Sequence, residues 1–272
     1  MAHKRAVVFP GQGTAGGEVS GEVARALERR VADGEPPYQL AVFASSVDLF
    51  YKLREAGVEP DLVAGHSLGE FAAAHAAGSM SLDDGVWLVG ERDRLMTEAA
   101  EKTPGGMVAL IGADAEEVER AVDGADGVVV AANFNTPRQV VVSGEKEALA
   151  GALEGIKGRK VPLRVAGAFH SPLMEGAAAR MEKLLAGVPF AEPEVPMVGA
   201  ANGEVLETGR AIRAALREQM LKPVRWNSVM ERFFDLGVDE IFEAGEDGTL
   251  TRMLKDFKRK EVRGVTAGEA LA

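Results

Sequence analysis

Short runs of apolar and β-branched residues alternate along the chain with longer segments in which apolar residues recur every three or four positions. The first pattern predicts buried strands and the second predicts amphipathic helices. Their alternation indicates an α/β fold with a mainly parallel sheet covered by helices. The predicted strands are 6–9, 62–64, 197–200 and 240–243, and the predicted helices include 40–56, 68–77, 82–99 and 210–220.

The middle of the chain has a different order of elements. Its pattern predicts a strand, a helix, two strands, a helix and a strand, at 107–112, 115–122, 128–133, 139–143, 146–156 and 159–165. This β-α-β-β-α-β order is typical of a ferredoxin-like unit. We therefore expect an α/β core formed by 1–104 and 167–272, with a ferredoxin-like subdomain inserted at 105–166.

Composition excludes several classes of function. The chain has 31 Lys and Arg residues against 42 Asp and Glu residues, a net charge of −11, which argues against a nucleic-acid partner because basic residues must neutralise phosphates. No apolar run approaches the roughly 20 residues that cross a bilayer, and the apolar run 6–9 is too short for a signal peptide. We therefore expect a cytoplasmic protein with no membrane partner. The absence of cysteine excludes a thiolate nucleophile and a cysteine-based metal site.

The segment Gly65-His66-Ser67-Leu68-Gly69 follows a predicted strand and opens a helix of small residues. A G-x-S-x-G turn between a strand and a helix forms the nucleophile elbow of α/β hydrolases, because the glycines permit a tight bend that exposes the serine hydroxyl. Ser67 is therefore the candidate nucleophile of a hydrolase-like core. The alternative is a glycine-rich turn that only packs the helix against the sheet.

A serine nucleophile needs a base, and the chain has four histidines, His3, His66, His75 and His170. His3 lies near the terminus, His66 is expected to point away on the sharp turn, and His75 lies two turns down the following helix. His170 is the best base by elimination. The alternative for His170 is a solvated surface residue.

Arg92 shares a line on its predicted helix with apolar residues, four positions after Leu88 and three before Leu95. A charge on that line needs a partner. The planar guanidinium suits a carboxylate, which can belong either to the protein or to an anionic substrate.

Backbone amides are free in the turn Pro10-Gly11-Gln12-Gly13 directly after the first strand. Such a turn can supply one amide of an oxyanion hole, with a second from Leu68, the residue after the nucleophile. The alternative is a tight loop without a catalytic role.

Taken together, these motifs resemble those of malonyl-CoA:acyl-carrier-protein transacylases, and the likeness covers nearly the whole chain. The matching segments, in chain order, are Phe9–Gly13, Gly65–Glu70, Arg92, Asn133–Gly144, Ala168–Met174 and Pro223–Trp226. The resemblance also agrees with an inserted ferredoxin-like unit.

The resemblance implies roles for individual residues. It makes Ser67 the acylated nucleophile, His170 the base, and Arg92 the residue that binds the malonyl carboxylate. It assigns the oxyanion hole to the amides of Gln12 and Leu68. Gln39 and Phe169 become pocket residues, and the residues beside Ser67 and His170 follow the malonyl-selective pattern.

The sequence departs from the family in two places. Between Gly13 and Gln39 the chain is shorter than the resemblance leads us to expect, so the helices that wall the acyl and pantetheine channel should be reduced. Where the family has a Gly-Pro-Gly loop whose carbonyl orients the histidine, this chain has Gly245-Glu246-Asp247-Gly248. Either a carbonyl of that loop or the carboxylate of Glu246 or Asp247 is expected to orient His170.

The resemblance implies transfer of a malonyl group from malonyl-CoA to the phosphopantetheine thiol of acyl carrier protein by a ping-pong exchange, without a metal or redox cofactor. A serine esterase or thioesterase of α/β-hydrolase type is the nearest alternative, although those enzymes place the acid before the histidine. A catalytically silent module that docks carrier protein is the other. For carrier-protein docking, the basic segment 255–263 is the richest candidate surface.

Overall fold

The computed structural model describes residues 3–31 and 34–272. Its central feature is a six-stranded sheet of order β10-β9-β1-β2-β7-β8, in which every neighbouring pair is parallel except β7 and β8. The strands are β1 (Arg5–Phe9), β2 (Leu62–Gly65), β7 (Met197–Val198), β8 (Val205–Leu206), β9 (Glu240–Glu243) and β10 (Arg263–Thr266). The mainly parallel sheet predicted from the alternation of elements is confirmed.

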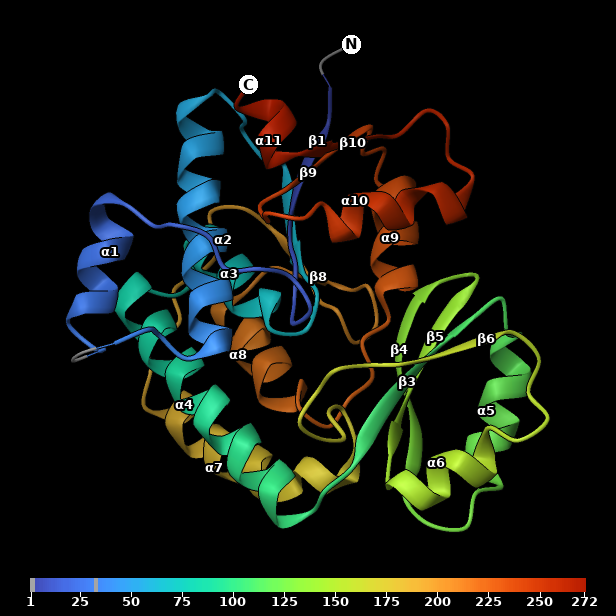
Figure 1. The fold of residues 1–272 in the computed structure, drawn as a ribbon. Helices are drawn as coiled ribbons and strands as arrows, with labels where there is room; N and C mark the ends of the chain where they lie inside the picture. The colour runs from blue at the N-terminus through green and yellow to red at the C-terminus, as the bar shows by residue number, and fades with distance from the viewer. Residues whose placement is uncertain (1–2, 32–33) are drawn as a thin grey trace.

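Helices cover both faces of this sheet (Figure 1). Alternate residues of a strand point to opposite faces, so Val7 and Phe9 join the larger hydrophobic core while Ala6 and Val8 join the smaller one. The larger core is covered by α1 (Gly21–Glu28), α2 (Tyr38–Glu55), α3 (Gly69–Ala76), α4 (Leu82–Lys102), the short η1 (Pro172–Met174), α7 (Glu175–Ala186), α8 (Gly209–Glu218) and α11 (Ala267–Ala270). The smaller core is covered by α9 (Trp226–Asp235), α10 (Thr249–Met253) and the short η2 (Leu254–Phe257).

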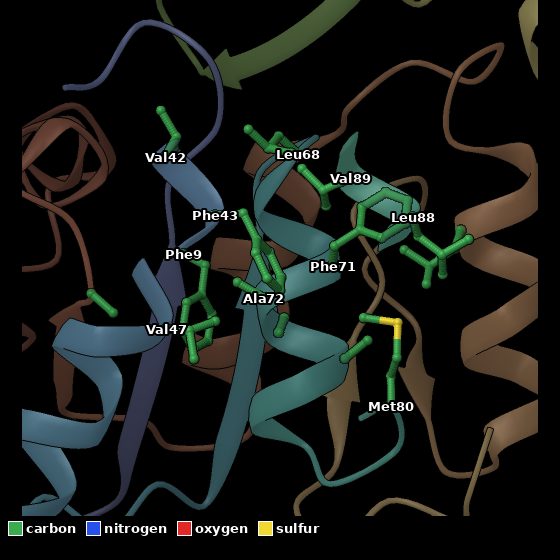
Figure 2. Close-up of a cluster of buried hydrophobic side chains, with 14 of the residues drawn as sticks. Phe9, Val42, Phe43, Val47, Leu68, Phe71, Ala72, Met80, Leu88 and Val89 are labelled. Carbon is green, nitrogen blue, oxygen red and sulfur yellow. The ribbon is translucent and has the colours of Figure 1, made fainter. Parts of the chain in front are cut away.

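Aromatic and aliphatic side chains join the central strand to the first long helices (Figure 2). Phe9 of β1, Phe43 of α2, Phe71 of α3 and Leu88 of α4 are all buried in one cluster. Burying side chains of this size contributes roughly 1.5–3 kcal/mol each. The cluster therefore fixes α3, which begins directly after Ser67 and Leu68, and α4, which carries Arg92, relative to the sheet.

A second sheet of four antiparallel strands lies beside the main sheet, with two helices on one face. Its strand order is β4-β5-β3-β6, as expected for a ferredoxin-like unit. Its elements are β3 (Gly106–Ile111), α5 (Ala115–Asp123), β4 (Val129–Thr136), β5 (Gln139–Gly144), α6 (Lys146–Ala152) and β6 (Arg159–Pro162). Leu110 and Val142 pack under the helices, whereas Met107 and Val141 join the larger core. The domain boundaries at 104/105 and 166/167 stay a prediction.

Several predicted elements end earlier in the structure than in the sequence prediction. The strand expected at 159–165 ends at Pro162, and the helix expected at 146–156 ends at Ala152. In the described part of the segment 14–37, α1 is the only helix, and it has eight residues. The expectation that this wall is reduced relative to the family stays a prediction.

Candidate active site

Ser67 lies on a sharp turn between β2 and α3, with a positive φ of 52°. The turn requires glycine on both sides. A Cβ at Gly65 would lie 2.0 Å from the carbonyl carbon of Gly69, and a Cβ at Gly69 would lie 2.1 Å from the carbonyl oxygen of Phe9. Strain of this kind at a non-glycine residue is a feature of functional sites, and the geometry is that of the predicted nucleophile elbow.

His170 is the histidine that reaches Ser67. Its Nε2 lies 2.7 Å from Ser67 Oγ, and both side chains are buried. On its other side Nδ1 lies 2.8 Å from the carbonyl oxygen of Gln219 and 3.1 Å from that of Lys222. Because carbonyl oxygens only accept, Nδ1 carries the proton and Nε2 accepts the hydrogen bond from the Ser67 hydroxyl.

The charge state of His170 suits a base. Burial, and after it the positive charge of Arg92, lower the pKa of His170 to about 4. The imidazole is therefore neutral at neutral pH, and Nε2 is free to take the serine proton.

The prediction that the loop Gly245–Gly248 orients His170 is wrong. The orienting carbonyls belong to Gln219 and Lys222, just after α8. Glu246 instead accepts a hydrogen bond from Ser45 Oγ at 3.0 Å, and Asp247 accepts one from the amide of Ala15 at 2.9 Å. Asp247 thus holds the segment that follows Gln12, Glu246 is bonded to α2, and neither orients the base.

Arg92 is fully buried, and its guanidinium points at the nucleophile. Nη2 lies 3.3 Å from Ser67 Oγ, Nε donates to Gln219 Oε1 at 3.0 Å, and Nη1 donates to Gln39 Oε1. Among the described residues, no carboxylate lies within 4.0 Å of this guanidinium. Although burial lowers the pKa of Arg92 to about 10, the side chain stays cationic at neutral pH. The arrangement favours an anionic substrate over the protein ion pair that the sequence left open.

Gln39 and Phe169, the two candidate pocket residues, have different positions. Phe169 lines the pocket in front of Ser67, whereas Gln39 is buried behind it as a partner of Arg92. Gln39 therefore positions the guanidinium and does not line the pocket itself.

The pocket lies between the main sheet and the second sheet. The main core contributes Gly11, Gln12, Ser67 and His170, and Thr249, Leu250 and Met253 of α10 form another side. The ferredoxin-like unit contributes Met107, Asn133, Asn135 and Val141. In the described chain, the amides of Gln12 and Leu68 donate to no protein acceptor, so both are available to an oxygen bound beside Ser67.

Two functional candidates escaped the sequence analysis. The Gln219 side chain contacts Arg92 and also donates to the carbonyl oxygen of Ser67 at 2.7 Å, while Glu70 accepts from Gln219 Nε2 at 3.0 Å. The sequence pattern could have indicated that Gln219 is buried. It lies seven positions after Ile212 and three after Leu216, both buried, and so continues the apolar line of α8 just past the end of the helix. This is the same signal that singled out Arg92.

The remaining histidines have structural partners. His66 Nε2 donates to Asn135 Oδ1 at 2.8 Å, which links the elbow to the ferredoxin-like unit. His75 Nε2 lies 2.7 Å from the hydroxyl of Tyr51. His3 is exposed and pairs with Asp239. His170 is therefore the only histidine of the described chain that contacts Ser67 Oγ.

In the part of the chain that the structure describes, no helix combines the length and the apolar character needed to cross a membrane.

Comparison with known proteins agrees with this geometry. The acyl transferase domain family matches residues 30–267. The malonyl CoA-acyl carrier protein transacylase of Bacillus subtilis is 34% identical over 230 residues, which cover 82% of this chain and 72% of the relative.

Solved structures match over nearly the full length. The malonyl-CoA:ACP transacylase of Synechocystis superposes with a TM-score of 0.88 at 29% identity, covering 98% of this chain and 97% of that one. A malonyl-transacylase solved in complex with a type II polyketide-synthase acyl-carrier protein superposes with a TM-score of 0.83 at 31% identity, covering 97% and 96%. These matches confirm the resemblance drawn from the motifs. The chain belongs to the acyl transferase domain family.

Proposed function

We propose that this protein transfers a malonyl group from malonyl-CoA to the phosphopantetheine thiol of an acyl carrier protein through an acyl-enzyme on Ser67. The observation that carries the proposal is that Ser67 Oγ lies 3.3 Å from Arg92 Nη2 and 2.7 Å from His170 Nε2. In a malonyl thioester one methylene separates the carbonyl carbon from the carboxylate. A carboxylate bound by Arg92 therefore brings the carbonyl carbon to the serine oxygen.

In the first half-reaction Ser67 Oγ attacks the thioester carbonyl while His170 Nε2 takes the serine proton. The carbonyls of Gln219 and Lys222 stabilise the imidazolium through the Nδ1 proton. The amides of Gln12 and Leu68 are placed to bind the oxyanion. Collapse of the tetrahedral intermediate breaks the carbon–sulfur bond, and the proton on His170 passes to the CoA thiolate.

The second half-reaction runs the same steps in reverse with a different thiol. His170 takes the proton of the phosphopantetheine thiol, the thiolate attacks the malonyl ester, and the proton returns to Ser67. The chemistry uses no metal or redox cofactor.

The names of the relatives support both substrates, and the solved complex of a related transacylase with an acyl-carrier protein supports the partner. The product would serve as an extender unit in fatty-acid or polyketide synthesis. A cytoplasmic location stays a prediction.

Ser67→Ala tests the nucleophile. After mixing with malonyl-CoA, the parent protein should gain one malonyl group by intact mass, and the variant should gain none, because the described pocket offers no other hydroxyl on the elbow. A malonyl adduct on the variant at the parent rate would refute the assignment. Adding holo acyl carrier protein distinguishes a transferase from an esterase, because a transferase moves the malonyl group to the carrier-protein thiol faster than to water.

A further inference from the structure

Glu70 is a buried acid that the steps above do not use. It lies in the first turn of α3, three residues after Ser67, and only 3% of its surface is exposed. One carboxylate oxygen accepts from the amide of Ala200 at 2.9 Å, and the other accepts from Gln219 Nε2 at 3.0 Å. The helix N-terminus favours a negative charge at this position.

Glu70 and Arg92 are opposite charges buried in the same cluster, yet they do not touch. The amide of Gln219 lies between them, accepting from Arg92 Nε at 3.0 Å and donating to Glu70. A buried charge without a counter-charge is strongly unfavourable, so each of the two stabilises the other across this amide.

The separation leaves the guanidinium balanced in charge but open to a ligand. A carboxylate in direct contact would occupy the donors of Arg92 that face Ser67. With Gln219 in between, the Nη2 group stays directed at Ser67 Oγ.

We propose that Glu70 is the resident counter-charge of Arg92 and that it takes up a proton when the malonyl carboxylate binds to Arg92. The inference rests on the proposed function, because it needs an anionic acyl group in this pocket. A second carboxylate near one guanidinium places two like charges close together, and the buried acid relieves this repulsion by becoming neutral. Glu70 thereby makes the preference for malonyl over uncharged acyl groups depend on pH.

The pKa of Glu70 lies near neutral pH. Burial raises the pKa of Glu70 to about 7, although the bonds from Ala200 and Gln219 and the charge of Arg92 favour its ionised form. The charged neighbours on α4 are Arg92 and, beside it, Asp93. The titratable neighbours His170 and His66 both have a pKa lowered by burial and are neutral near pH 7. From the segments that follow β7 and α8, the groups in contact are the neutral Ala200 amide and the Gln219 side chain.

The proton balance separates this event from the chemistry. In acylation the serine proton passes through His170 to the CoA thiol, so the reaction itself takes up no proton. An acetyl group leaves Arg92 without a new negative charge, and Glu70 has no reason to titrate. Any proton taken up in malonylation beyond that in acetylation therefore reports the binding of the malonyl carboxylate.

The test compares acylation by malonyl-CoA and acetyl-CoA in weakly buffered indicator solution at pH 7.5 to 8. Malonylation should take up a measurable fraction of a proton per enzyme beyond acetylation. The ratio of kcat/KM for malonyl over acetyl should also rise as the pH is lowered from 8.5 to 6, by about tenfold for each unit by which malonyl raises the pKa of Glu70. Equal proton uptake for both acyl groups, or a flat ratio, would overturn the proposal without any variant.

Glu70→Gln introduces a neutral side chain of the same size. It should abolish both the extra proton uptake on malonylation and the pH dependence of the malonyl-to-acetyl ratio. The matched control is Asp48→Asn. Asp48 is a buried carboxylate on α2 that accepts from Ser20 and pairs with Lys52, none of which lines the pocket, and its variant should keep both effects. A malonyl-to-acetyl ratio that still rises as the pH is lowered in Glu70→Gln would refute the role of Glu70. If the parent protein gains no malonyl adduct at any pH, the proposed function itself fails, which distinguishes the two failures.

Discussion

At position 92 a guanidinium is fully buried with two glutamine side chains and the nucleophile as its hydrogen-bond partners. Gln39 and Gln219 satisfy donors without neutralising the charge. The residue is therefore held in place by neutral groups and remains able to bind an anion.

Arg92→Ala should lower malonyl transfer far more than acetyl transfer, because an acetyl group has no carboxylate for the guanidinium to bind. Losing a buried charge-assisted contact costs about 2–5 kcal/mol, or tens- to thousands-fold in rate. Competition between malonyl-CoA and acetyl-CoA measures the effect. Arg94→Ala, on the exposed side of the same helix, is the matched control and should keep the ratio. An unchanged ratio in Arg92→Ala would assign the residue to structure alone.

Single residues could be predicted where a side chain breaks a pattern. Ser67 lies in a turn with required glycines, and Arg92 interrupts an apolar line, so the sequence pointed to both. The orienting group of His170 is a backbone carbonyl, which has no signature in the sequence. The sequence therefore pointed to the loop 245–248, through a carbonyl or through Glu246 or Asp247, and the structure places both carboxylates elsewhere.

Among the elements, the segment after β1 shows how a short stretch without regular structure is held beside the nucleophile. The Tyr38 hydroxyl accepts from the amide of Gly13 at 2.7 Å and donates to the carbonyl of Thr14 at 2.9 Å. Asp247 holds Ala15 on the other side of Thr14. These contacts position the Gln12 amide, one of the two proposed oxyanion donors.

Tyr38→Phe should lower the kcat of malonyl transfer and of acetyl transfer by the same factor, about tenfold. Complete loss of one oxyanion donor costs about 100- to 1,000-fold in kcat, and this change only loosens the segment that holds the Gln12 amide. The malonyl-to-acetyl ratio should stay the same, in contrast to Arg92→Ala. Tyr51→Phe, on the same helix but bonded to His75, is the control and should keep the rate. A rate for Tyr38→Phe equal to that of the control would contradict this role.

Elements with clear periodicity were predicted well, and short or polar ones were not. Strand 240–243 and the start of α4 at Leu82 agree with the structure, and the Ser81 cap defines the helix start. The strand expected at 197–200 is only two residues long, β7, and β8, which was not predicted, also has two residues, too few to show alternation. β7 pairs with β2, which is distant in sequence, and β8 joins the sheet only through β7.

On the scale of the whole molecule, charge is distributed unevenly. The chain carries −11 overall, yet Lys255, Lys258 and Lys260 are exposed on the segment that follows α10, and α10 lines the pocket. Arg259 in the same segment is partly engaged, since it lies over the ring of Phe234 and 3.5 Å from Glu231. The three lysines are therefore the better docking candidates.

Replacing Lys255, Lys258 and Lys260 by Glu should slow transfer to an acidic carrier protein and weaken its dependence on salt, because charges at the rim act mainly on the association rate. Acylation by malonyl-CoA should change little. Reversal of Arg210 and Arg213, on α8 and outside the residues that line the active-site pocket, is the control of matching chemistry. Equal transfer rates at low salt in the parent and the lysine variant would exclude this surface.

The central position of β1 has a consequence for how the chain folds. Ala6 pairs with Leu62 on one side and with Ile241 on the other, so the main sheet cannot close until the last part of the chain is present. The four strands of the second sheet pair with one another between residues 106 and 162, and such local contacts form faster. Pulse-labelled hydrogen exchange during refolding should show protection of β3 and β5 amides before those of β1 and β9, and the opposite order would contradict this. The pocket needs both sheets, so catalytic competence should be the last property that a refolding chain recovers.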